Sequence, residues 1–472
     1  MNRQIYSLLL YSSIPFIFAG CMHYSSYQSP KSQITSVWSQ NTPNSNHKVD
    51  DLTQWWSQFN DPVLGQLIET AQDNSPNLLK AWAKIEQARA TLTTSKASLF
   101  PSLTGSASAK RAKDGQVSNQ GAGSLDASWE IDLFGKIRKQ NEAAQSRIEA
   151  RQDDWHDARI SLAAEVVDDY VQYRSCELLV AVYQNELQSM QKTEQANSQM
   201  VKAGFTAPMD GALSRANLAS TQMNLLNQQK QCDLLVKTLV QVTGMQETAL
   251  RPLLNSGKSK SLPKPALFNV SDVPAQMLQH RPDIAALERE VYATYAEIGS
   301  AQADRYPSLS LTGVISTVLT GGTSAASWSF GPALSLPIFD AGQKKAAVES
   351  AKATYVSAIA DYQSGVRSAV SEVEQALVQL NSIAAQEQAS ENSVREYENY
   401  FNALQLSWKA GNTNLLDLES ARRSSLSAQM SQIELQTSRV QQWIALYKAM
   451  GGGWQKNAVV TQPETSLKDI NF

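Results

Sequence analysis

The chain repeats itself at an interval of about 206 residues, and this repeat constrains the fold more than any other feature of the sequence. The segment SLFPSLTG at 98–105 returns as DRYPSLSLTG at 304–313, and VKAGFTAPMD at 201–210 returns as WKAGNTNLLD at 408–417. A solenoid unit spans only roughly 20 to 50 residues, so this repeat is too long for one. The repeat predicts two half-molecules that build the same set of helices and strands.

The N-terminus predicts a lipoprotein signal peptide over residues 1–20. A positive charge at Arg3 precedes an apolar run over 5–18, and small residues then lead to Cys21. This arrangement resembles bacterial lipoprotein signals, in which the cysteine becomes the acylated first residue; an ordinary signal peptide and an uncleaved anchor are the alternatives. Several acyl chains would hold the protein firmly to a membrane. By the same resemblance, Met22 in place of an aspartate favours the outer membrane.

The remaining chain divides into a tether, two repeats and the segments around them. The tether is rich in Ser, Pro, Asn and Gln, which is a composition typical of an extended chain. Tryptophans and leucines between the tether and the first repeat predict a short helix packed on the body of the protein. The expected boundaries are a lipidated tether over 21–50, an N-terminal segment over 51–75, a first repeat over 76–250, a linker over 251–281, a second repeat over 282–453 and a tail over 454–472.

Within each repeat we expect one helix, two strands, a very long helix and a last helix, a fold class that is mainly α with a small β portion. Pro76 and Pro282 suit the first helical positions, and Gly244 and Gly451 suit the ends of the last helices. The expected helices lie over 76–98, 136–203 and 210–243, and over 282–304, 343–410 and 414–449. The expected strands lie over 101–111, 123–134, 307–319 and 326–339.

The strand segments have the pattern of membrane β-barrel strands. Apolar and polar residues alternate over 124–133 and again over 327–336, as they do in a barrel wall that faces lipid on one side and a wet lumen on the other. A half-buried strand of a soluble sandwich has the same pattern. The carboxylates expected to face the lumen are Asp126, Glu130 and Asp132. Four strands cannot close a barrel, so either several chains share one barrel or the chain is not in the membrane.

The stretch over 136–203 contains neither proline nor glycine. As one helix it would be roughly 100 Å long, and it would have to pack along its length as coiled-coil helices do. A membrane core is only about 30 Å thick. The sequence therefore predicts a helical rod that crosses an aqueous space.

The composition and the motifs exclude several other classes of protein. The net charge is −3, so there is no basic field for a nucleic acid. No H-E-x-x-H zinc motif is present, and the phosphate-loop-like Gly257-Lys258-Ser259 has Pro252 where such a loop needs its first glycine. The adjacent pairs Asp153-Asp154 and Asp168-Asp169 suit solvated helix charges better than a catalytic pair. We expect no enzymatic activity, no metal and no cofactor apart from the lipid on Cys21.

Cys176 and Cys232 lie 28 residues before and 28 residues after Gly204. If the two helices that flank this glycine are antiparallel, the two thiols come to about the same height. A disulfide needs Cα atoms about 5.5 Å apart, which facing residues of neighbouring helices can reach. We therefore expect either this disulfide or two buried, unpaired thiols.

Several motifs resemble the TolC/OprM outer-membrane factor family, and within it the NodT-like efflux lipoproteins. WWSQFNDPVLGQLIETAQDNSPNL at 55–78 resembles the opening motif of the family. WEIDLFGKIR at 129–138 and LPIFDAGQ at 336–343 resemble the two strand-to-helix junctions, and their separation makes the pair specific. RPDI at 281–284 resembles the start of the second repeat, and YKAMGGGW at 447–454 resembles the end of the lipoprotein branch.

The resemblance implies a homotrimer in which three chains of four strands form a twelve-stranded outer-membrane β-barrel, continued by an α-helical barrel through the periplasm. The implied function is passive conduction of drugs, other small toxic compounds or metal ions towards the exterior. The implied partners are a periplasmic adaptor protein, an inner-membrane efflux transporter and outer-membrane lipid. The alternative class is an outer-membrane-anchored coiled-coil lipoprotein with a structural or adhesive role.

The resemblance also places a gate at the turns that follow the longest helices. In related proteins a carboxylate six residues after the turn glycine narrows the pore, which corresponds to Asp417 in the second repeat and to Asp210 in the first. Three Asp417 side chains around a threefold axis would repel one another and attract cations. The alternative is that both aspartates are helix N-caps. The other candidate gate residues are Thr413, Glu419 and Ser420, which stands where relatives place a second aspartate.

Overall fold

The structure is a computed structural model that describes residues 27–30, 52–257, 261–263, 281–454 and 460. The predicted signal peptide, Cys21, most of the tether, most of the linker and most of the tail beyond 454 lie outside these residues. The described residues form two compact units. The sheet unit comprises Ile85–Ala150 and Leu287–Tyr362 with residues 27–30, and the helical unit comprises the described parts of Ser32–Lys84, Arg151–Ala286 and Gln363–Phe472.

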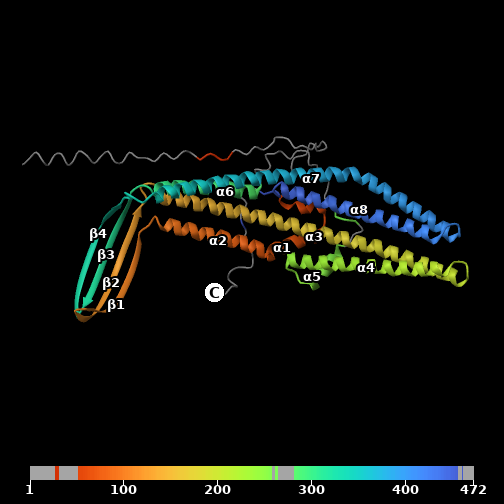
Figure 1. Cartoon of the computed structure of the whole chain (residues 1–472), viewed down its shortest axis with the longest axis horizontal. Helices are drawn as coiled ribbons and strands as arrows, with labels where there is room; N and C mark the ends of the chain where they lie inside the picture. The colour runs from red at the N-terminus through yellow and green to blue at the C-terminus, as the bar shows by residue number, and fades with distance from the viewer. Residues whose placement is uncertain (1–26, 31–51, 258–260, 264–280, 455–459, 461–472) are drawn as a thin grey trace, which may run out of the picture. The chain divides into compact units, whose positions relative to one another are not determined.

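The order of elements confirms the two repeats (Figure 1). The first half contains η1 Leu52–Phe59, α1 Pro62–Asn74, α2 Pro76–Ala97, β1 Ser102–Asp114, β2 Gln116–Ile131, α3 Lys136–Lys202, α4 Pro208–Thr243 and α5 Glu247–Ser256. The second half contains α6 Pro282–Ala303, β3 Ser308–Thr320, β4 Thr323–Ser335, α7 Gln343–Lys409 and α8 Leu415–Ala449. The corresponding helices match in length, since α3 and α7 have 67 residues each and α2 and α6 have 22 residues each.

Four elements differ from the sequence-based expectation. The hairpin of β1 and β2 is longer than predicted, because its outer residues are polar and glycine-rich and lack the alternation that marks a strand; Gly115 makes its turn at φ +72°. Strand β4 ends at Ser335, before Pro337 and the turn at Asp340. Helix α5 crosses the boundary predicted at 250 between the first repeat and the linker; Leu250 and Leu254 are fully buried and hold the segment in place, although Pro252 lies inside it.

The N-terminal segment also forms two elements, η1 and α1, where one short helix was expected. Asp61 caps α1 by accepting a hydrogen bond of 3.0 Å from the Val63 amide, which satisfies an otherwise unpaired donor. The same carboxylate accepts a 2.7 Å bond from the Tyr170 hydroxyl of α3. Trp55 stacks on Tyr447 of α8 at 4.3 Å between ring centroids. These contacts bind η1 and α1 to the core of the helical unit.

Helix α8 lies antiparallel along α3 in the helical unit. The Thr437 hydroxyl donates to Ser175 at 2.7 Å, and the Gln441 amide donates to Asp168 at 2.8 Å. As the residue number rises along α8, the number of its partner on α3 falls. Side chains separated by more than 260 residues thus join the two repeats along this line of contact.

Cys176 and Cys232 form a disulfide between α3 and α4, with their Cα atoms 5.6 Å apart. Both side chains are buried. The bond closes a sequence separation of 56 residues, which restricts the unfolded chain. The first helical hairpin is therefore covalently cross-linked below its turn. At the corresponding height the second hairpin has an ion pair, in which Arg439 of α8 contacts Glu387 of α7 at 2.5 Å.

Removing the disulfide with Cys176→Ser/Cys232→Ser should lower the free energy of unfolding by about 2–4 kcal/mol, because the closed loop of the unfolded chain is released. Urea unfolding of the purified protein, with and without prior reduction, measures this change. The matched control is reduction of the double variant, which should leave its unfolding midpoint unchanged. An equal midpoint for the wild type and the variant, both unreduced, would contradict the expected contribution.

The sheet unit contains four antiparallel strands in the order β1-β2-β3-β4 (Figure 1). The register aligns apolar with apolar residues, since Leu125 stands opposite Ile315, and Ile315 opposite Trp328. On the other face, serine hydroxyls meet across the strands at 2.8 Å, as in Ser106 with Ser124. The apolar face is exposed, and its large side chains are Leu103, Leu125, Ile315, Trp328, Phe330 and Leu334. Among the residues that the structure describes, strands β1 and β4 pair on only one side each.

The junctions between sheet and helices are fixed by aspartates. Asp132 lies just beyond the end of β2, where it accepts hydrogen bonds from the amides of Ile137 and Arg138 at 3.1 and 3.0 Å. Asp340 holds the start of α7 in the same way, since it accepts bonds from the amides of Gly342 and Lys344. Asp132 is therefore not a residue of β2 as predicted, because the strand ends at Ile131 and the carboxylate is used to start α3. Among the described residues, no helix combines the length and the hydropathy needed to cross a membrane.

Candidate functional site at the helical turns

The two long helical hairpins of the helical unit end in turns of the same construction. Gly204 and Gly411 have φ values of +82° and +77°, a backbone region that favours glycine. The amides that follow them reach back to the preceding helix, from Phe205 to the Met200 carbonyl and from Asn412 to the Ser407 carbonyl, both at 2.9 Å. This pattern is the Schellman motif, which ends a helix abruptly. The repeated K-A-G sequence thus encodes two equivalent reversals of the chain.

Asp417 lies in the first turn of α8, but it does not cap the helix. Asn414 is the N-cap, and its side chain accepts a 2.8 Å bond from the Asp417 amide. The Asp417 carboxylate is exposed and accepts a hydrogen bond of 3.3 Å from the Thr413 hydroxyl. Its negative charge also suits the positive end of the helix dipole. The N-cap interpretation of Asp417 is therefore wrong, and its carboxylate projects into solvent.

Asp210 lies in the first turn of α4, where the N-cap is Ala207. Its backbone carbonyl accepts a 2.9 Å bond from the buried Asn197 amide of α3, which also donates to Ser214 at 3.1 Å. The N-cap interpretation fails for Asp210 as well. Asp210 is half-buried where Asp417 is exposed, so the two repeats present their aspartates differently.

Glu419 does not accompany Asp417 on the exposed side of α8. Its side chain is 4% exposed and lies within the packing of α8, and its carboxylate forms an ion pair with Arg422 at 3.4 Å. Ser420, by contrast, is exposed. The structure thus keeps Asp417, Thr413 and Ser420 accessible near the turn. The prediction that Glu419 is a gate residue is therefore corrected: its side chain is buried and belongs to the packing that supports the turn.

Arg422 is the centre of a buried polar cluster that the sequence analysis did not predict. The guanidinium, 4% exposed, donates to the Ser189 hydroxyl and, at 2.7 Å, to the Thr193 hydroxyl of α3. Its carbon Cζ lies 5.0 Å from the ring centroid of Phe401 on α7. One side chain therefore ties together three helices near the turns. The only local signal was the E-x-x-R spacing, which places Glu419 and Arg422 on one face of a helix.

The cluster contains two carboxylates and one buried cation, and the exposed Arg423 adds a second positive charge that acts on Glu419. Burial raises the pKa of Glu419, and the positive charge of Arg422 opposes this increase. Burial also raises the pKa of Glu186 on α3, where Arg422 again opposes the change and Glu419 reinforces it. Arg422 thus favours the charged form of both carboxylates, against the effect of burial.

Apolar contacts complete the support of the turns. Trp408 at the end of α7 and Leu415 and Leu418 at the start of α8 form a buried cluster. Ala196 and Met200 of α3 pack against it. The second turn is thus packed against α3, and this apolar cluster supports the exposed residues near the turn.

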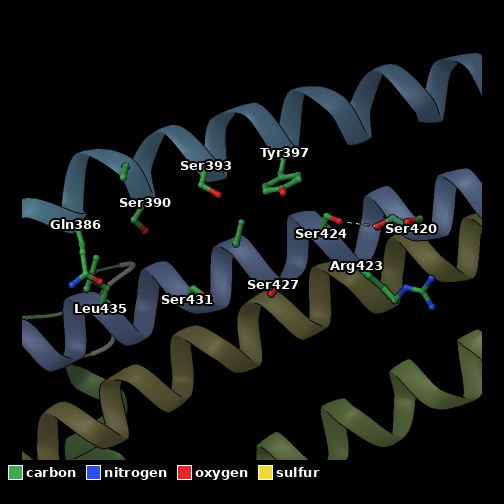
Figure 2. Close-up of a pocket in the computed structure, with 12 residues that line it drawn as sticks. Gln386, Ser390, Ser393, Tyr397, Ser420, Arg423, Ser424, Ser427, Ser431 and Leu435 are labelled. Atoms are coloured by element: carbon green, nitrogen blue, oxygen red, sulfur yellow. Dashed lines mark hydrogen bonds between the residues drawn. The ribbon is translucent and has the colours of Figure 1, made fainter. Parts of the chain in front are cut away.

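A polar groove of about 660 Å³ runs between α7 and α8 (Figure 2). Ser390, Ser393 and Tyr397 of α7 face α8 across this groove, and Ser420 lies near one end. Ser424 uses its hydroxyl locally, donating to the Ser420 carbonyl at 3.1 Å. The groove between the two helices stays open because the serine side chains that line it are small.

The remaining candidates are possible metal ligands and the adjacent pair Asp168-Asp169. The described residues contain no group of three or more His, Cys, Asp and Glu suited to a metal ion. Asp168 is not simply solvated, because it accepts bonds from Gln172 and Gln441. Burial raises the pKa of Asp169 to about 7, with a further contribution from the neighbouring charge of Asp168.

Comparison with known families gives two matches in this chain. Residues 67–245 and 273–452 each fall within the sequence profile described as "Outer membrane efflux protein". Together they cover more than half of the chain and coincide with the two structural repeats.

Individual relatives extend over almost the whole chain. It is 28% identical to the antibiotic efflux pump outer membrane protein ArpC of Pseudomonas putida, over 98% of this chain and 99% of that protein. It is also 28% identical to nodulation protein T of Rhizobium leguminosarum bv. trifolii, over 93% of this chain and 96% of that protein. The solved structure of the outer-membrane channel OprN is similar with a TM-score of 0.81 at 28% identity, covering 92% of this chain and all of that one.

Proposed function

Because the chain belongs to the outer membrane efflux protein family, we propose that it forms the outer-membrane exit duct of a tripartite efflux system. Its cargo is small toxic compounds such as drugs, which it conducts passively to the exterior. A relative of nearly the same length is named for antibiotic efflux, which supports this class of cargo. The partners of the duct are a periplasmic adaptor and an inner-membrane transporter that supplies the driving force.

The observation that carries this proposal is the sheet with one apolar and one polar face. Trp328 is 80% exposed and Phe330 is 73% exposed, an arrangement that is costly in water and favourable in lipid. The free edges of β1 and β4 would leave unpaired backbone groups in a membrane. Three chains that join these edges make a closed barrel of twelve strands. Homotrimerisation thus satisfies the backbone and hides both edges at once.

The lumen of this barrel is lined by the polar face of the sheet. Asp126 and Glu130 alternate with the apolar residues of β2 and belong to this face. The Asp126 carboxylate accepts a 2.6 Å bond from Ser124 beside it. These carboxylates give the exit of the duct a negative lining. The lipid anchor on Cys21 holds each chain to the outer membrane as a second attachment.

Detergent-extracted trimers should form ion-conducting pores in planar lipid bilayers, because a closed barrel with a polar lumen conducts water and ions. Single-channel recording of the purified full-length protein provides the measurement. A protein without the signal peptide that stays a water-soluble, non-conducting rod would contradict the duct. That result would support an anchored coiled-coil lipoprotein with a structural or adhesive role.

The gate of the duct lies at the turns, with Asp417 as its main residue and Asp210 as its counterpart in the first repeat. Asp417 is exposed and held by Thr413 and Asn414, so three copies near a threefold axis would present a ring of fixed negative charge. Such a ring attracts cations. Ser420 lies one turn further along α8 and provides a second, neutral constriction.

Asp417→Asn should reduce the block of the channel by divalent cations, because it removes the ring of charge and keeps the oxygen that Thr413 contacts. We expect Asp417→Ala to reduce the block as well and also to raise conductance by widening the constriction. Single-channel recording with and without Mg²⁺ measures both effects. The matched control is Glu396→Gln, an exposed carboxylate on α7 away from the turn. Unchanged conductance and block in both Asp417 variants would remove Asp417 from the gate.

A further inference from the structure

One end of the sheet is positively charged, although the chain as a whole has a net charge of −3. Each strand meets a helix at one end, so both hairpin turns lie at the other end (Figure 1). Three basic residues stand near the first turn on β1, and the only acidic residue of the hairpin end is Asp114. The second hairpin has no charged residue in β3 or β4. The basic residues are Lys110, Arg111 and Lys113.

The strand register places these three residues on different faces. Odd-numbered residues of β1 share the face of Leu103, which stands opposite Ala127 on the apolar side. Arg111 and Lys113 therefore continue the apolar face. Lys110 belongs to the polar face, on the same side as the paired serines. All three residues are exposed.

Arg111 and Lys113 also lie beyond the apolar band. Arg111 stands opposite Asn119, which is 12 residues along β2 from Ile131 at the helical end of the sheet. Twelve strand residues span about 40 Å. With the usual strand tilt of about 40°, this length along the strand corresponds to about 30 Å across the membrane. The apolar band of a membrane barrel is only about 25 Å tall, so Arg111 lies outside it. The last pair between β2 and β3 is Gln120 with Thr320, so Arg111 projects past the end of β3.

We propose that Arg111 and Lys113 bind the phosphate groups of lipids in the outer leaflet of the outer membrane. This proposal rests on the proposed function, which places the hairpin ends at the outer surface. The aliphatic parts of both side chains can lie along the apolar face while their charges reach the headgroups. Arginine in particular can bind a phosphate with two parallel hydrogen bonds.

The placement favours lipid over a soluble partner. The two charges border an exposed apolar surface that only acyl chains cover in the trimer, and a phospholipid offers both matching parts in one molecule. In a trimer six such charges surround the outer rim of the barrel. They would fix the height of the barrel in the membrane and retain a ring of phosphorylated lipids.

The test measures binding of diphosphorylated lipid A to purified full-length trimers in detergent by native mass spectrometry. Arg111→Gln/Lys113→Gln should weaken retention of this lipid by about ten-fold or more, since each charge near an anionic headgroup contributes to binding. The same lipid without its phosphates should bind weakly and equally to both proteins. Free inorganic phosphate should not displace the lipid, because it cannot cover the apolar face.

Lys110→Gln is the control for the face of the strand, because it removes one positive charge from the same strand on the opposite face, where each change of the double variant removes one from the apolar face. It should leave lipid retention unchanged. Equal retention by the wild type and the double variant would overturn the proposal, and so would an equal loss with Lys110→Gln. The double variant should still conduct ions like the wild type. Absence of conductance in the wild type would instead overturn the duct itself, so the two failures can be distinguished.

Discussion

Ile315→Lys is expected to prevent assembly of the trimer in the outer membrane. Ile315 lies at the middle of the apolar band of β3, opposite Leu125 and Trp328, and it is 64% exposed. A lysine on the lipid face at the membrane midplane costs about 2–4 kcal/mol, and each trimer would contain three of them. The measurement is the amount of trimer in purified outer membranes, detected on gels without heating.

The neighbouring variant Ser316→Lys provides the control. Ser316 contacts Ser327 at 2.8 Å on the polar face, so its replacement places the same charge on the next residue of the same strand but towards water. We expect Ser316→Lys to assemble at close to the wild-type level. If both variants assembled equally well, the apolar face would not be in contact with lipid and the barrel would have to be abandoned.

Arg422→Met should loosen the helices that support the gate. The substitution removes the bonds to Ser189 and Thr193 and leaves Glu419 buried without its cation. Breaking a buried ion pair by removing one partner costs about 3–5 kcal/mol. Local opening of α8 near the turn should therefore become at least about a hundred-fold more frequent. Hydrogen exchange of residues 415–430, followed by mass spectrometry, measures this change.

Two further variants identify the cause of this effect. Arg423→Met removes an equal charge from the next, exposed residue; this charge also acts on Glu419 but makes no buried contact, so exchange should change far less than in Arg422→Met. Glu419→Gln combined with Arg422→Met removes the carboxylate that pairs with Arg422, leaving only Glu186, and should restore part of the protection, because a neutral amide is less costly to bury. No recovery in the double variant would show that the bonds to α3, rather than the ion pair, carry the stabilisation.

The main elements of the fold were predictable because their signals are local. A stretch without proline or glycine predicted α3, and the repeat placed α7 at the corresponding position of the second half; both helices begin and end within one residue of the expected limits. Alternation predicted β2 and β4, and their partners followed from the repeat; the polar end of the first hairpin lacked this signal. Helix α5 was missed because its internal Pro252 outweighed two buried leucines in the sequence pattern.

The candidate gate was only partly predictable. The spacing after the turn glycines led to Asp417 and Asp210, and the structure places both in the first turn of a helix. The sequence could not show that Glu419 is buried. It is a charged residue between the exposed Asp417 and Ser420, so nothing in the local pattern distinguishes it from them. Nor could it show the role of Arg422, whose partners on α3 are more than 220 residues away.

The sequence by itself determined the two repeats, the helices, the turns at Gly204 and Gly411 and the alternation of each strand, because these features depend on neighbouring residues. Only the tertiary structure decided the register of the strands, that is, which residues of neighbouring strands stand opposite each other. That register separates Arg111 and Lys113 from Lys110 and leaves the edges of β1 and β4 unpaired within the chain. It also decided which charges are buried, since burial depends on helices that are distant in sequence. Long-range packing sets these properties, and no local pattern encodes it.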